Sequence, residues 1–359
     1  IDQFPITTKF LIPVGYKSDL IKEYLQHTYG NSRSFQFIEC DWESTNSGTS
    51  TTLKNCIDFI DGPFWYIACD TYFDSSVDDF FNITTDGDVY FCQECPSDSA
   101  TKYTTMTQNY GVVTDIKFKK PRKEHKTCNA FIGMMRVADY KKFFRDLFVC
   151  NSLEHADSLR IGSTIKMITS WIDMGNPNEY KKAVEETQPY DFTKPSELTW
   201  FCNDKVIKWW HDSDVVAKKH TRSLYNLPVL PDGIRRSNSM LSYDMVEGET
   251  LYSRQDPALF SSLLSWLKND VWVPINKDIS RACESFYYTK TVQRVESFLA
   301  RYDNEVPDIK TVNGYRVKEY RDLLTMVDWD LLFNENRSVW IHGDLHFDNL
   351  VVCLLYTSD

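Results

Sequence analysis

Short apolar runs alternate with amphipathic segments over residues 1–70, and this alternation limits the possible folds more than any other feature of the chain. Residues after Ser18, which can cap a helix, and residues 52–60 have helical spacing. The runs typical of strands are residues 9–14, 35–38 and 63–69. Such alternation predicts a mostly parallel α/β sheet, in which ligands bind at the carboxyl ends of strands. The third run is apolar enough to predict a central strand buried on both faces, and Asp70 follows its carboxyl end.

Composition limits the class of protein. A chain of 359 residues is long enough for two domains, and an apolar content of 42% can supply a sizeable core. The formal net charge of −11 argues against binding to nucleic acid or anionic membranes. The absence of a run of 18 apolar residues and of a leader argues against membrane insertion and export, so we expect a cytoplasmic protein.

The ten cysteines are scattered, and Cys92 and Cys95 form the single C-x-x-C pair. A zinc site needs four ligands, and no second close pair follows, so reduced cysteines are the favoured interpretation. A basic run extends over residues 117–126. Its members are Lys117, Lys119, Lys120, Arg122, Lys123 and Lys126. Without aromatic stacking surfaces or a basic domain around it, this run predicts a solvated β-ribbon near a phosphorylated substrate rather than a nucleic-acid site.

Three segments of the N-terminal part carry a resemblance. Residues 14–17 (Val-Gly-Tyr-Lys), 46–53 (Asn-Ser-Gly-Thr-Ser-Thr-Thr-Leu) and 63–70 resemble the sugar-phosphate nucleotidyltransferases, which include the cytidylyltransferases that activate phosphocholine. The resemblance covers about residues 1–185 and implies a GT-A-like, Rossmann-type mixed α/β sheet. It implies that Asp70 binds Mg²⁺ and that Gly48 and Thr49 lie against the base and ribose of a nucleoside triphosphate, where glycine allows close backbone approach.

Two later segments extend this resemblance. Residues 129–134 (Asn-Ala-Phe-Ile-Gly-Met) are similar to the substrate-side strand of the family, which implies that Gly133 lies at the substrate. Residues 171–180 (Trp-Ile-Asp-Met-Gly-Asn-Pro-Asn-Glu-Tyr) resemble its second metal-binding segment, which implies that Asp173 joins Asp70 on one cation. Two acidic side chains from distant positions suit a Mg²⁺-nucleotide site. Either carboxylate alone would more simply be a capping or surface group.

After a linker at residues 186–197, a new pattern begins. Residues 198–210 predict an antiparallel hairpin with Lys208 in its second strand. In kinase-like families such a lysine holds the ATP phosphates. A surface lysine on an edge strand is the alternative. In most kinases a helix glutamate pairs with this lysine, and the helix at 214–224 offers none, so either the partner lies elsewhere or the assignment is wrong.

The segment His342-Gly343-Asp344-Leu345-His346-Phe347-Asp348-Asn349 lies between two apolar strands and resembles the catalytic loop of the aminoglycoside phosphotransferase and choline kinase families. The resemblance implies that Asp344 is the catalytic base, Asn349 a metal ligand and His346 a substrate contact. A polar β-turn with incidental charges is the alternative. Residues 241–251 resemble the hinge between kinase lobes, so that Glu247 and Gly248 would lie at the ATP.

Residues 292–299 and 320–332 are expected to form helices of the second lobe. The resemblance therefore implies an α+β protein-kinase-like domain at residues 198–352, with a small β lobe and a helical lobe that is truncated. Residues 353–359 look like a non-native tail. Because the chain opens on Ile1, and because neither the Gly-rich loop nor the last metal-binding aspartate of these families is found in it, we expect a fragment with little turnover.

The two resemblances together predict a bifunctional transferase that uses Mg²⁺, ATP and a second nucleoside triphosphate. One part would transfer a nucleotidyl group to a sugar phosphate or amino-alcohol phosphate, and the other would phosphorylate a small hydroxyl compound. Such a pairing suits the synthesis of precursors for cell-surface polysaccharides, as in capsule biosynthesis. The alternatives are a non-catalytic nucleotide-binding scaffold and a small-molecule kinase that modifies antibiotics. The sequence does not indicate an oligomeric state.

Overall fold

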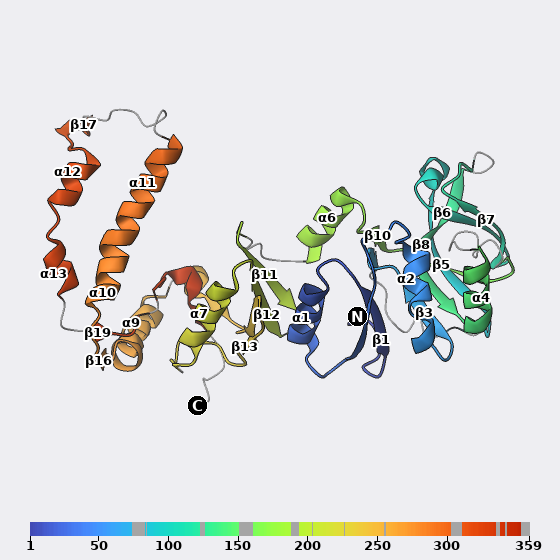
Figure 1. Cartoon of the computed structure of the whole chain (residues 1–359), viewed down its shortest axis with the longest axis horizontal. Helices are drawn as coiled ribbons and strands as arrows, with labels where there is room; N and C mark the ends of the chain where they lie inside the picture. The colour runs from blue at the N-terminus through green and yellow to red at the C-terminus, as the bar shows by residue number, and fades with distance from the viewer. Residues whose placement is uncertain are drawn as a thin grey trace. The chain divides into compact units, whose positions relative to one another are not determined.

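The computed structural model forms two compact units (Figure 1). The first consists of residues 1–221 and 233–245, and the second of residues 222–232 and 246–359. The described residues are 1–73, 83, 85–122, 126–150, 161–187, 194–202, 204–225, 227–254, 256–302, 311–334, 338–341 and 343–352. Residues 188–193 of the predicted linker, the tail at 353–359 and His342 therefore lie outside the described residues. The division into units does not follow the boundaries expected from the sequence, and the domain boundaries stay a prediction.

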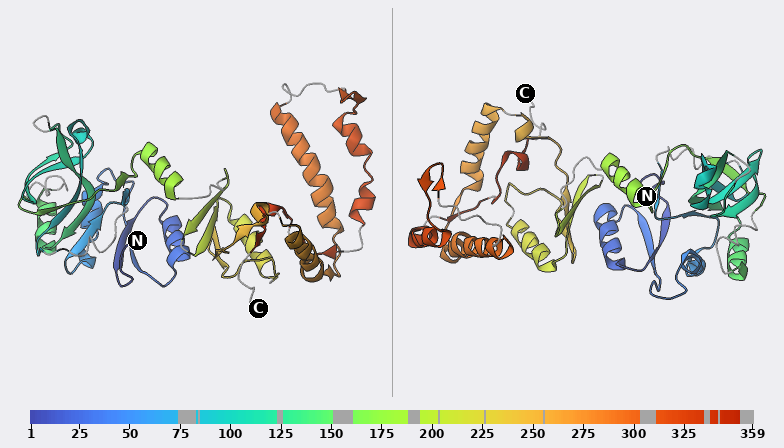
Figure 2. Two further views of the ribbon diagram at one scale, coloured as in Figure 1. Left: turned by 180° about the vertical axis from the view of Figure 1, so that it is seen from behind. Right: turned by 90° about the horizontal axis from the view of Figure 1, so that it is seen from above.

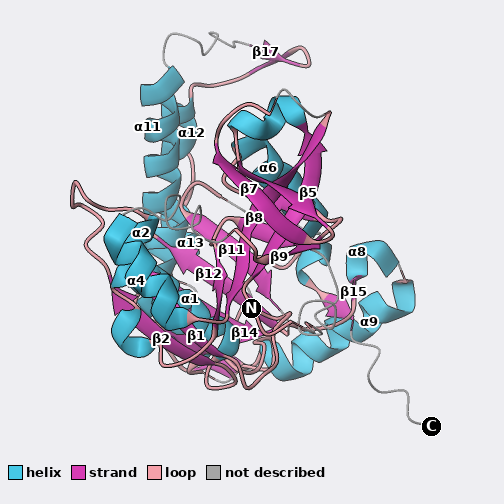
Figure 3. Ribbon diagram, turned by 90° about the vertical axis from the view of Figure 1, so that its right-hand side faces the viewer, coloured by secondary structure: helices cyan, strands magenta, loops and turns pink. Residues whose placement is uncertain are grey.

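The first unit contains a six-stranded sheet, the largest among the described strands, part of which is visible in Figure 3. In order across the sheet, its strands are β3 (Phe64–Ile67), β8 (Thr127–Val137), β5 (Val89–Pro96), β9 (Thr164–Met167), β7 (Val112–Phe118) and β6 (Thr104–Asn109). Only the β5–β9 pairing is parallel among the pairings of these described strands. The architecture is therefore mixed α/β, and the expectation of a mostly parallel sheet is wrong.

The strand β3 shows why that expectation failed. It lies first in the order of the sheet and pairs antiparallel with β8, so it is not central. Its apolar character has another cause, because Phe64 and Tyr66 pack on one face of the sheet whereas Trp65 and Ile67 pack on the other. An apolar run indicates that both faces of a strand pack against other parts of the protein. It does not indicate which strands lie beside it in the sheet.

The two faces of this sheet have separate cores. One face packs against α4 (Tyr140–Cys150), whose Phe143, Phe144 and Leu147 are buried, and α2 (Thr49–Lys54) contacts α4 on the same side. The other face buries Phe91 and Met134 together with residues from the N-terminal segment and from the strand that ends at Asp173. The second face therefore brings distant parts of the chain to one place.

The first strand–helix–strand unit agrees with the sequence prediction. The strands β1 (Lys9–Val14) and β2 (Ser34–Glu39) pair in parallel, and α1 (Ser18–Tyr29) connects them. Ser18 is the first residue of α1 and not its cap, because Lys17 precedes it with φ 56° and no side-chain capping bond forms. The helix expected at 52–60 is divided into α2 and a 3-10 turn, η1 (Ile57–Phe59).

The helix α1 also packs on a second sheet of the first unit. This sheet has the order β11 (Glu197–Cys202), β12 (Lys205–Trp210), β14 (Met240–Asp244) and β13 (Arg235–Arg236), and α7 (Ser213–Ser223) follows β12. The predicted hairpin is present as β11–β12. Its sheet contacts α1 through a buried polar network, so these strands form a compact unit with residues N-terminal to the expected linker.

Two side chains of α1 carry that network. One carboxylate oxygen of Glu23, Oε2, accepts hydrogen bonds from the Ser237 hydroxyl (2.7 Å) and from the amide and hydroxyl of Ser239 (3.1 and 2.8 Å). The buried imidazole of His27 contacts Ser242 Oγ through Nδ1 (2.7 Å) and Ser237 Oγ through Nε2 (2.9 Å). Since the Ser237 proton goes to Glu23, Ser237 accepts from Nε2–H and Ser242 donates to Nδ1. The neutral form of His27 therefore satisfies both contacts.

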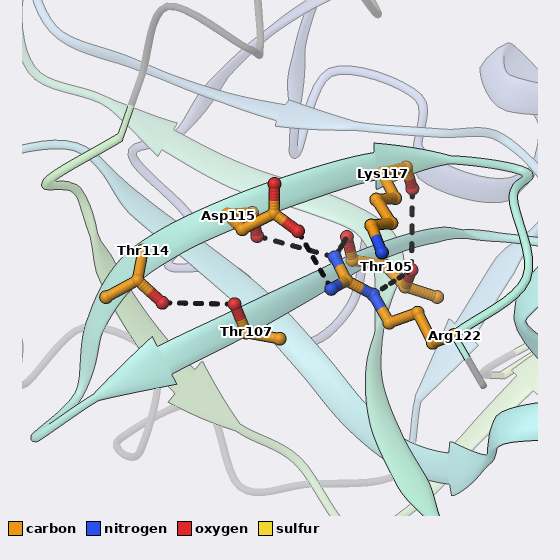
Figure 4. A network of polar contacts seen from close by, with 6 residues as sticks. All are labelled: Thr105, Thr107, Thr114, Asp115, Lys117 and Arg122. Atoms are coloured by element: carbon orange, nitrogen blue, oxygen red, sulfur yellow. Dashed lines mark hydrogen bonds and ion pairs between the residues drawn. The ribbon is translucent and has the colours of Figure 1, made fainter. Parts of the chain in front are cut away.

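The basic run at residues 117–126 is interrupted by a buried arginine (Figure 4). Arg122 is 1% exposed, and its guanidinium donates to Thr105 Oγ1 (2.7 Å), to the Thr105 carbonyl (2.7 Å) and to Asp115 Oδ2 (2.9 Å). The prediction of a solvated ribbon is thus wrong for Arg122. Lys119, Lys120 and Lys126 are exposed as expected, and Lys123 lies outside the described residues.

The second unit is built from helices and two-residue strand pairs. Its helical segments are α8 (Leu251–Arg254), α9 (Pro257–Trp266), η3 (Leu267–Val271), α10 (Ser280–Cys283), η4 (Glu284–Thr289), α11 (Lys290–Tyr302), α12 (Tyr320–Thr325), α13 (Trp329–Phe333) and η5 (Phe347–Asn349). The strand pairs are β15 (Glu249–Thr250) with β20 (Val351–Val352), β16 (Pro274–Ile275) with β19 (Ser338–Val339), and β17 (Thr311–Val312) with β18 (Tyr315–Arg316).

The helix expected at 320–332 is divided. Asp328 caps α13 by accepting from the Leu331 amide (3.2 Å), which separates α13 from α12. Figure 2 shows α11 and α12, in orange and red, as neighbours, and Tyr320 donates to Glu296 between them (3.0 Å). These elements do not show a kinase-like fold, which stays a prediction. Among the described residues, no helix is both long and apolar enough to cross a membrane.

Candidate functional site

A short antiparallel strand pair in the first unit brings Asp70 and Asp173 to the same place. The strand β4 (Thr71–Phe73) directly follows Asp70, and β10 (Trp171–Asp173) ends at Asp173. Thr71 lies opposite Asp173 in the register, and the Met174 amide donates to the Asp70 carbonyl (2.8 Å). Two aspartates that are far apart in the sequence therefore meet at one end of the pair.

The carboxylates of both aspartates face Gly175. A Cβ atom on Gly175 would lie 2.9 Å from Asp70 Oδ2 and 3.1 Å from Asp173 Oδ1. The Gly175 amide also donates to Asp173 Oδ1 (3.0 Å). A side chain here would overlap the carboxylates, so glycine leaves the space that they border. Two adjacent negative charges repel each other unless a cation or a proton lies between them.

The donor set suits a hard cation that also binds phosphate. No group of three or more acidic, histidine or cysteine side chains able to hold a metal occurs among the described residues. Two carboxylates alone are too few for a structural zinc site. They do suit Mg²⁺, which commonly binds one or two protein carboxylates and completes its octahedron with waters and substrate phosphates.

Tyr103 is a further member of this site that the sequence analysis did not identify. It follows η2 (Ser97–Thr101), and its ring packs edge-on against Trp171 with centroids 5.2 Å apart. Its hydroxyl forms a hydrogen bond with the Asp173 carboxylate, and burial, followed by the Asp173 charge, raises the pKa of Tyr103. The phenol therefore stays a donor that holds Asp173 in place. No local pattern around Tyr103 indicates this contact, because tertiary packing creates it.

Gly133, a residue of β8, lies next to the segment of chain that contains Asp70. Its φ is +80°, and a Cβ atom there would lie 2.8 Å from both Ala68 Cβ and Thr71 Oγ1. The Ala68 amide donates to the Gly133 carbonyl (2.8 Å), and the Thr71 hydroxyl donates to the Ile132 carbonyl. Gly133 thus allows β8 to approach the backbone on both sides of Asp70. This packing accounts for a glycine at position 133, and its predicted substrate contact stays a prediction.

A cleft of about 270 Å³ lies at the carboxyl ends of β1 and β2. Its lining includes Gly15, Tyr16, Trp42, Gly48, Thr51 and Asn55. The rings of Tyr16 and Trp42 are 5.0 Å apart and nearly edge-to-face, and Trp42 packs closely on Gly15. Gly48 precedes α2 and lines the cleft, whereas Thr49 begins α2 and does not line it. Two aromatic rings thus line the cleft, and its glycines would let a ligand come close to the backbone.

A larger cleft of about 560 Å³ is bordered by Lys9, Lys22 and Arg33. The guanidinium of Arg33 donates to the carbonyls of Phe4 and Pro5, and Lys22 forms an ion pair with Glu39. Two of the three cations therefore already have protein partners. We favour the smaller cleft as a ligand site because its lining contains Gly48, which the sequence resemblance predicts to lie against a nucleoside triphosphate.

Lys208 has a glutamate partner that the sequence analysis did not find. Its Nζ lies 3.3 Å from Glu197 Oε1, and Glu197 Oε2 accepts from Trp210 Nε1 (3.0 Å). The partner comes from β11, the neighbouring strand, rather than from a helix. Strand pairing brings Glu197 and Lys208 together, so no spacing rule for helices could have identified it. The role of Lys208 toward ATP stays a prediction.

The loop at 343–349 in the second unit brings its polar residues together. The Asn349 amide nitrogen donates to the Asp344 carbonyl (2.9 Å) and to Asp344 Oδ2 (3.1 Å). His346 Nε2 lies 3.9 Å from Asp344 Oδ2, and His346 Nδ1 lies 3.7 Å from Asp348 Oδ2. The side chains of Asp344, His346, Asp348 and Asn349 are exposed. The amide contact leaves the Asn349 side-chain oxygen available as a ligand.

The predicted hinge is a point of close backbone approach. A Cβ atom on Gly248 would lie 2.5 Å from the Val352 carbonyl oxygen, beside the pairing of β15 with β20. The neighbouring Glu247 is exposed. This contact explains a glycine at position 248 without a nucleotide, and the nucleotide role of both residues stays a prediction.

No protein-family model and no curated protein matches the sequence. Solved structures give a likeness over about half of the chain, to sugar nucleotidyltransferases. A protein described as a glucose-1-phosphate thymidylyltransferase of Bacillus anthracis, in complex with sucrose, has 17% identity over 51% of this chain and 78% of its own, with a TM-score of 0.40. HddC of Yersinia pseudotuberculosis has 20% identity over 52% of this chain and 81% of its own, with a TM-score of 0.38. A UDP-glucose pyrophosphorylase bound to UDP-glucose has 15% identity over 49% of this chain and 80% of its own, with a TM-score of 0.41.

Proposed function

We propose that the first unit transfers a nucleotidyl group from a nucleoside triphosphate to a sugar phosphate or amino-alcohol phosphate, with release of pyrophosphate. The observation that carries this proposal is the convergence of the Asp70 and Asp173 carboxylates on the space beside Gly175. A pair of carboxylates with room beside them is the donor set that a Mg²⁺-triphosphate complex requires.

Asp70 and Asp173 would hold the cation, which when bound offsets the negative charge of the triphosphate. Tyr103 would keep the Asp173 carboxylate oriented through its hydroxyl. The acceptor phosphate is already ionised at neutral pH and can attack the α-phosphorus without a protein base, while pyrophosphate leaves. The protein is then required mainly to position the two anions. The cleft beside Tyr16, Trp42 and Gly48 is of a size and character to receive a nucleobase.

Calorimetry with a nucleoside triphosphate and MgCl₂ tests this proposal, together with an assay of pyrophosphate release over a panel of triphosphates and phosphorylated acceptors. Asp70→Asn and Asp173→Asn should each weaken Mg²⁺-dependent nucleotide binding by about 100-fold or more, because each removes a ligand charge. Asp61→Asn changes an exposed aspartate outside the site and should bind as the unchanged chain does. Equal affinity in all three variants would refute the metal site.

A second candidate activity is the phosphorylation of a small hydroxyl compound by ATP at the loop of residues 343–349. The hydrogen bond from the Asn349 amide to Asp344 supports it, because this contact holds the carboxylate that would accept the proton of a hydroxyl beside the amide whose oxygen would bind a cation. His346 would contact the substrate. Together the two activities would make a bifunctional transferase for precursors of cell-surface polysaccharides.

Release of ADP in the presence of candidate alcohols tests the second candidate. Asp344→Asn should abolish the release, whereas Asp348→Asn, in the same exposed loop, should leave most of it. Mg²⁺-dependent ATP binding without any product from the unchanged chain would favour a non-catalytic scaffold instead.

A further inference from the structure

Two cysteines lie directly opposite each other on neighbouring strands. Cys95 of β5 pairs in register with Cys128 of β8, and the two strands are antiparallel. Their sulfur atoms are 3.4 Å apart. This contact does not follow from the C-x-x-C spacing in the sequence, because Cys128 is far from Cys95 along the chain.

The backbone at this position already fits a disulfide. Cα atoms that face each other in antiparallel strands are roughly 4.5 to 5.5 Å apart. Disulfides need a Cα separation of roughly 4.4 to 6.8 Å. Rotation of the side chains can therefore bring the two sulfurs from contact distance to a bond of about 2.05 Å without movement of the strands.

The other cysteine of the C-x-x-C pair is not available for this bond. Side chains alternate between the faces of a strand, so Cys92 and Cys95, three positions apart, point to opposite faces. Cys92 is fully buried, and its sulfur contacts Met106 Sδ at 3.9 Å on the face that also buries Tyr90. Cys95 therefore has Cys128 as its disulfide partner and not Cys92.

Access to the pair is unequal. Cys95 is half-buried, whereas Cys128 is 5% exposed, so an oxidant in solution reaches Cys95 first. Burial and the neighbouring Cys128 thiol raise the pKa of Cys95, and Asp98 acts in the same direction. The Ala130 amide acts in the opposite direction through a hydrogen bond to the sulfur. Little thiolate is present at neutral pH, so the pair should react slowly there and faster in alkaline solution.

We propose that Cys95 and Cys128 are a redox modification site, at which a low-molecular-weight disulfide such as oxidised glutathione converts the thiol pair into a cross-strand disulfide. The Cys95 thiolate attacks one glutathione sulfur, and one glutathione leaves as its thiolate. The Cys128 thiolate then attacks the Cys95 sulfur of the mixed disulfide and displaces the second glutathione. The chain loses two electrons and two protons, and two molecules of reduced glutathione are formed.

The test uses the full reduced chain, incubated with oxidised glutathione. Free thiols are then alkylated, and the chain is digested without reductant for mass spectrometry. Peptides containing Cys95 and Cys128 should be joined, and the joined species should disappear on reduction. The exposed Cys69 should form a mixed disulfide in the same sample, which shows that the oxidant is active. The rate of joining should rise about tenfold for each pH unit between pH 7 and pH 8.5.

Matched variants separate this pair from the other thiols. Cys128→Ser should abolish the joined peptides and leave Cys95 as a mixed disulfide with glutathione, whereas Cys92→Ala should still give the joined peptides. In the unchanged chain, oxidation should raise the urea midpoint of unfolding and reduction should lower it again, because a disulfide restricts the unfolded chain. Cys128→Ser should show no such shift. Joining of Cys92 to Cys95, or alkylation of both Cys95 and Cys128 while Cys69 is fully modified, would overturn the proposal.

Discussion

Gly133 and Gly111 have nearly the same backbone conformation but different surroundings. Their φ values are +80° and +78°, yet a Cβ atom would collide with Ala68 and Thr71 at Gly133 and would meet nothing within 4 Å at Gly111. Gly111→Ala therefore measures the cost of the left-handed conformation alone, about 1 kcal/mol. Gly133→Ala adds a steric overlap of about 1 to 3 kcal/mol. Urea unfolding of both variants checks this difference, and equal losses would contradict it.

The buried Arg122 provides a second comparison between single residues. Arg122→Met removes the guanidinium that donates to Thr105 and Asp115, so the buried Thr105 carbonyl loses its hydrogen bond from Arg122. We therefore expect the free energy of unfolding to fall by about 2 to 4 kcal/mol. Lys120→Met, in the same basic run but exposed, should change it by less than about 0.5 kcal/mol. Thermal or urea unfolding measures both, and an Arg122 variant as stable as the Lys120 variant would refute the buried network.

Tyr103 tests the proposed metal site through a residue that does not touch the cation. Tyr103→Phe keeps the ring against Trp171 and removes the hydroxyl that bonds to Asp173. Mn²⁺ affinity, measured by electron paramagnetic resonance, should fall about 10- to 100-fold, as for other groups that orient a metal ligand. Tyr110→Phe, whose ring is 98% exposed, is the control and should bind normally. Unchanged affinity in Tyr103→Phe would exclude a positioning role.

At the scale of elements, the packing of α1 on its sheet should depend on pH. Burial lowers the pKa of His27, although Glu23 opposes the shift and Arg235 adds to it. The unfolded chain then binds this proton more readily than the folded chain does. The contribution of His27 is present above the unfolded pKa of about 6.5, and it is lost as the pH falls below that value towards the folded pKa.

His27→Gln should remove this part of the pH dependence. The free energy of unfolding of the unchanged chain should fall between pH 7 and pH 5 with a slope of at most about 1.4 kcal/mol per pH unit from His27. The slope should be smaller in His27→Gln and unaltered in His211→Gln, an exposed histidine that follows β12. Urea unfolding at several pH values provides the measurement. An unaltered slope in His27→Gln would show that the imidazole is not the responsible group.

At the scale of the whole molecule, the two units differ in the size of their cores. The first unit buries Tyr90, Phe91, Phe143 and many other apolar side chains, whereas the described part of the second unit buries few, among them Leu251, Leu267 and Val271. We expect hydrogen exchange to be slow in β5 and β8 and faster in α11 and α12, because local stability follows apolar burial. Mass spectrometry of the exchanged peptides tests this, and stronger protection in α11 than in β8 would contradict it.

Local patterns in the sequence predict much of the order of the elements. The predicted strands β1 and β2, the helix between them and the hairpin β11–β12 are present, because each depends on a few neighbouring residues with strand or helix periodicity. The same patterns placed β3 at the centre of a parallel sheet and Arg122 in solvent. Both errors concern contacts set by strand pairing and packing, on which a local pattern carries no information.

The residue types at the candidate site can be read from the sequence, since aspartates that follow strands and glycines at turns are local features. Only the tertiary structure decided that Asp70 and Asp173 both face Gly175, that Tyr103 bonds to Asp173, that Glu197 pairs with Lys208 and that Cys95 lies opposite Cys128. The reason is physical: strand pairing and packing of sheet faces set these distances, and they join residues whose separation along the chain has no fixed period.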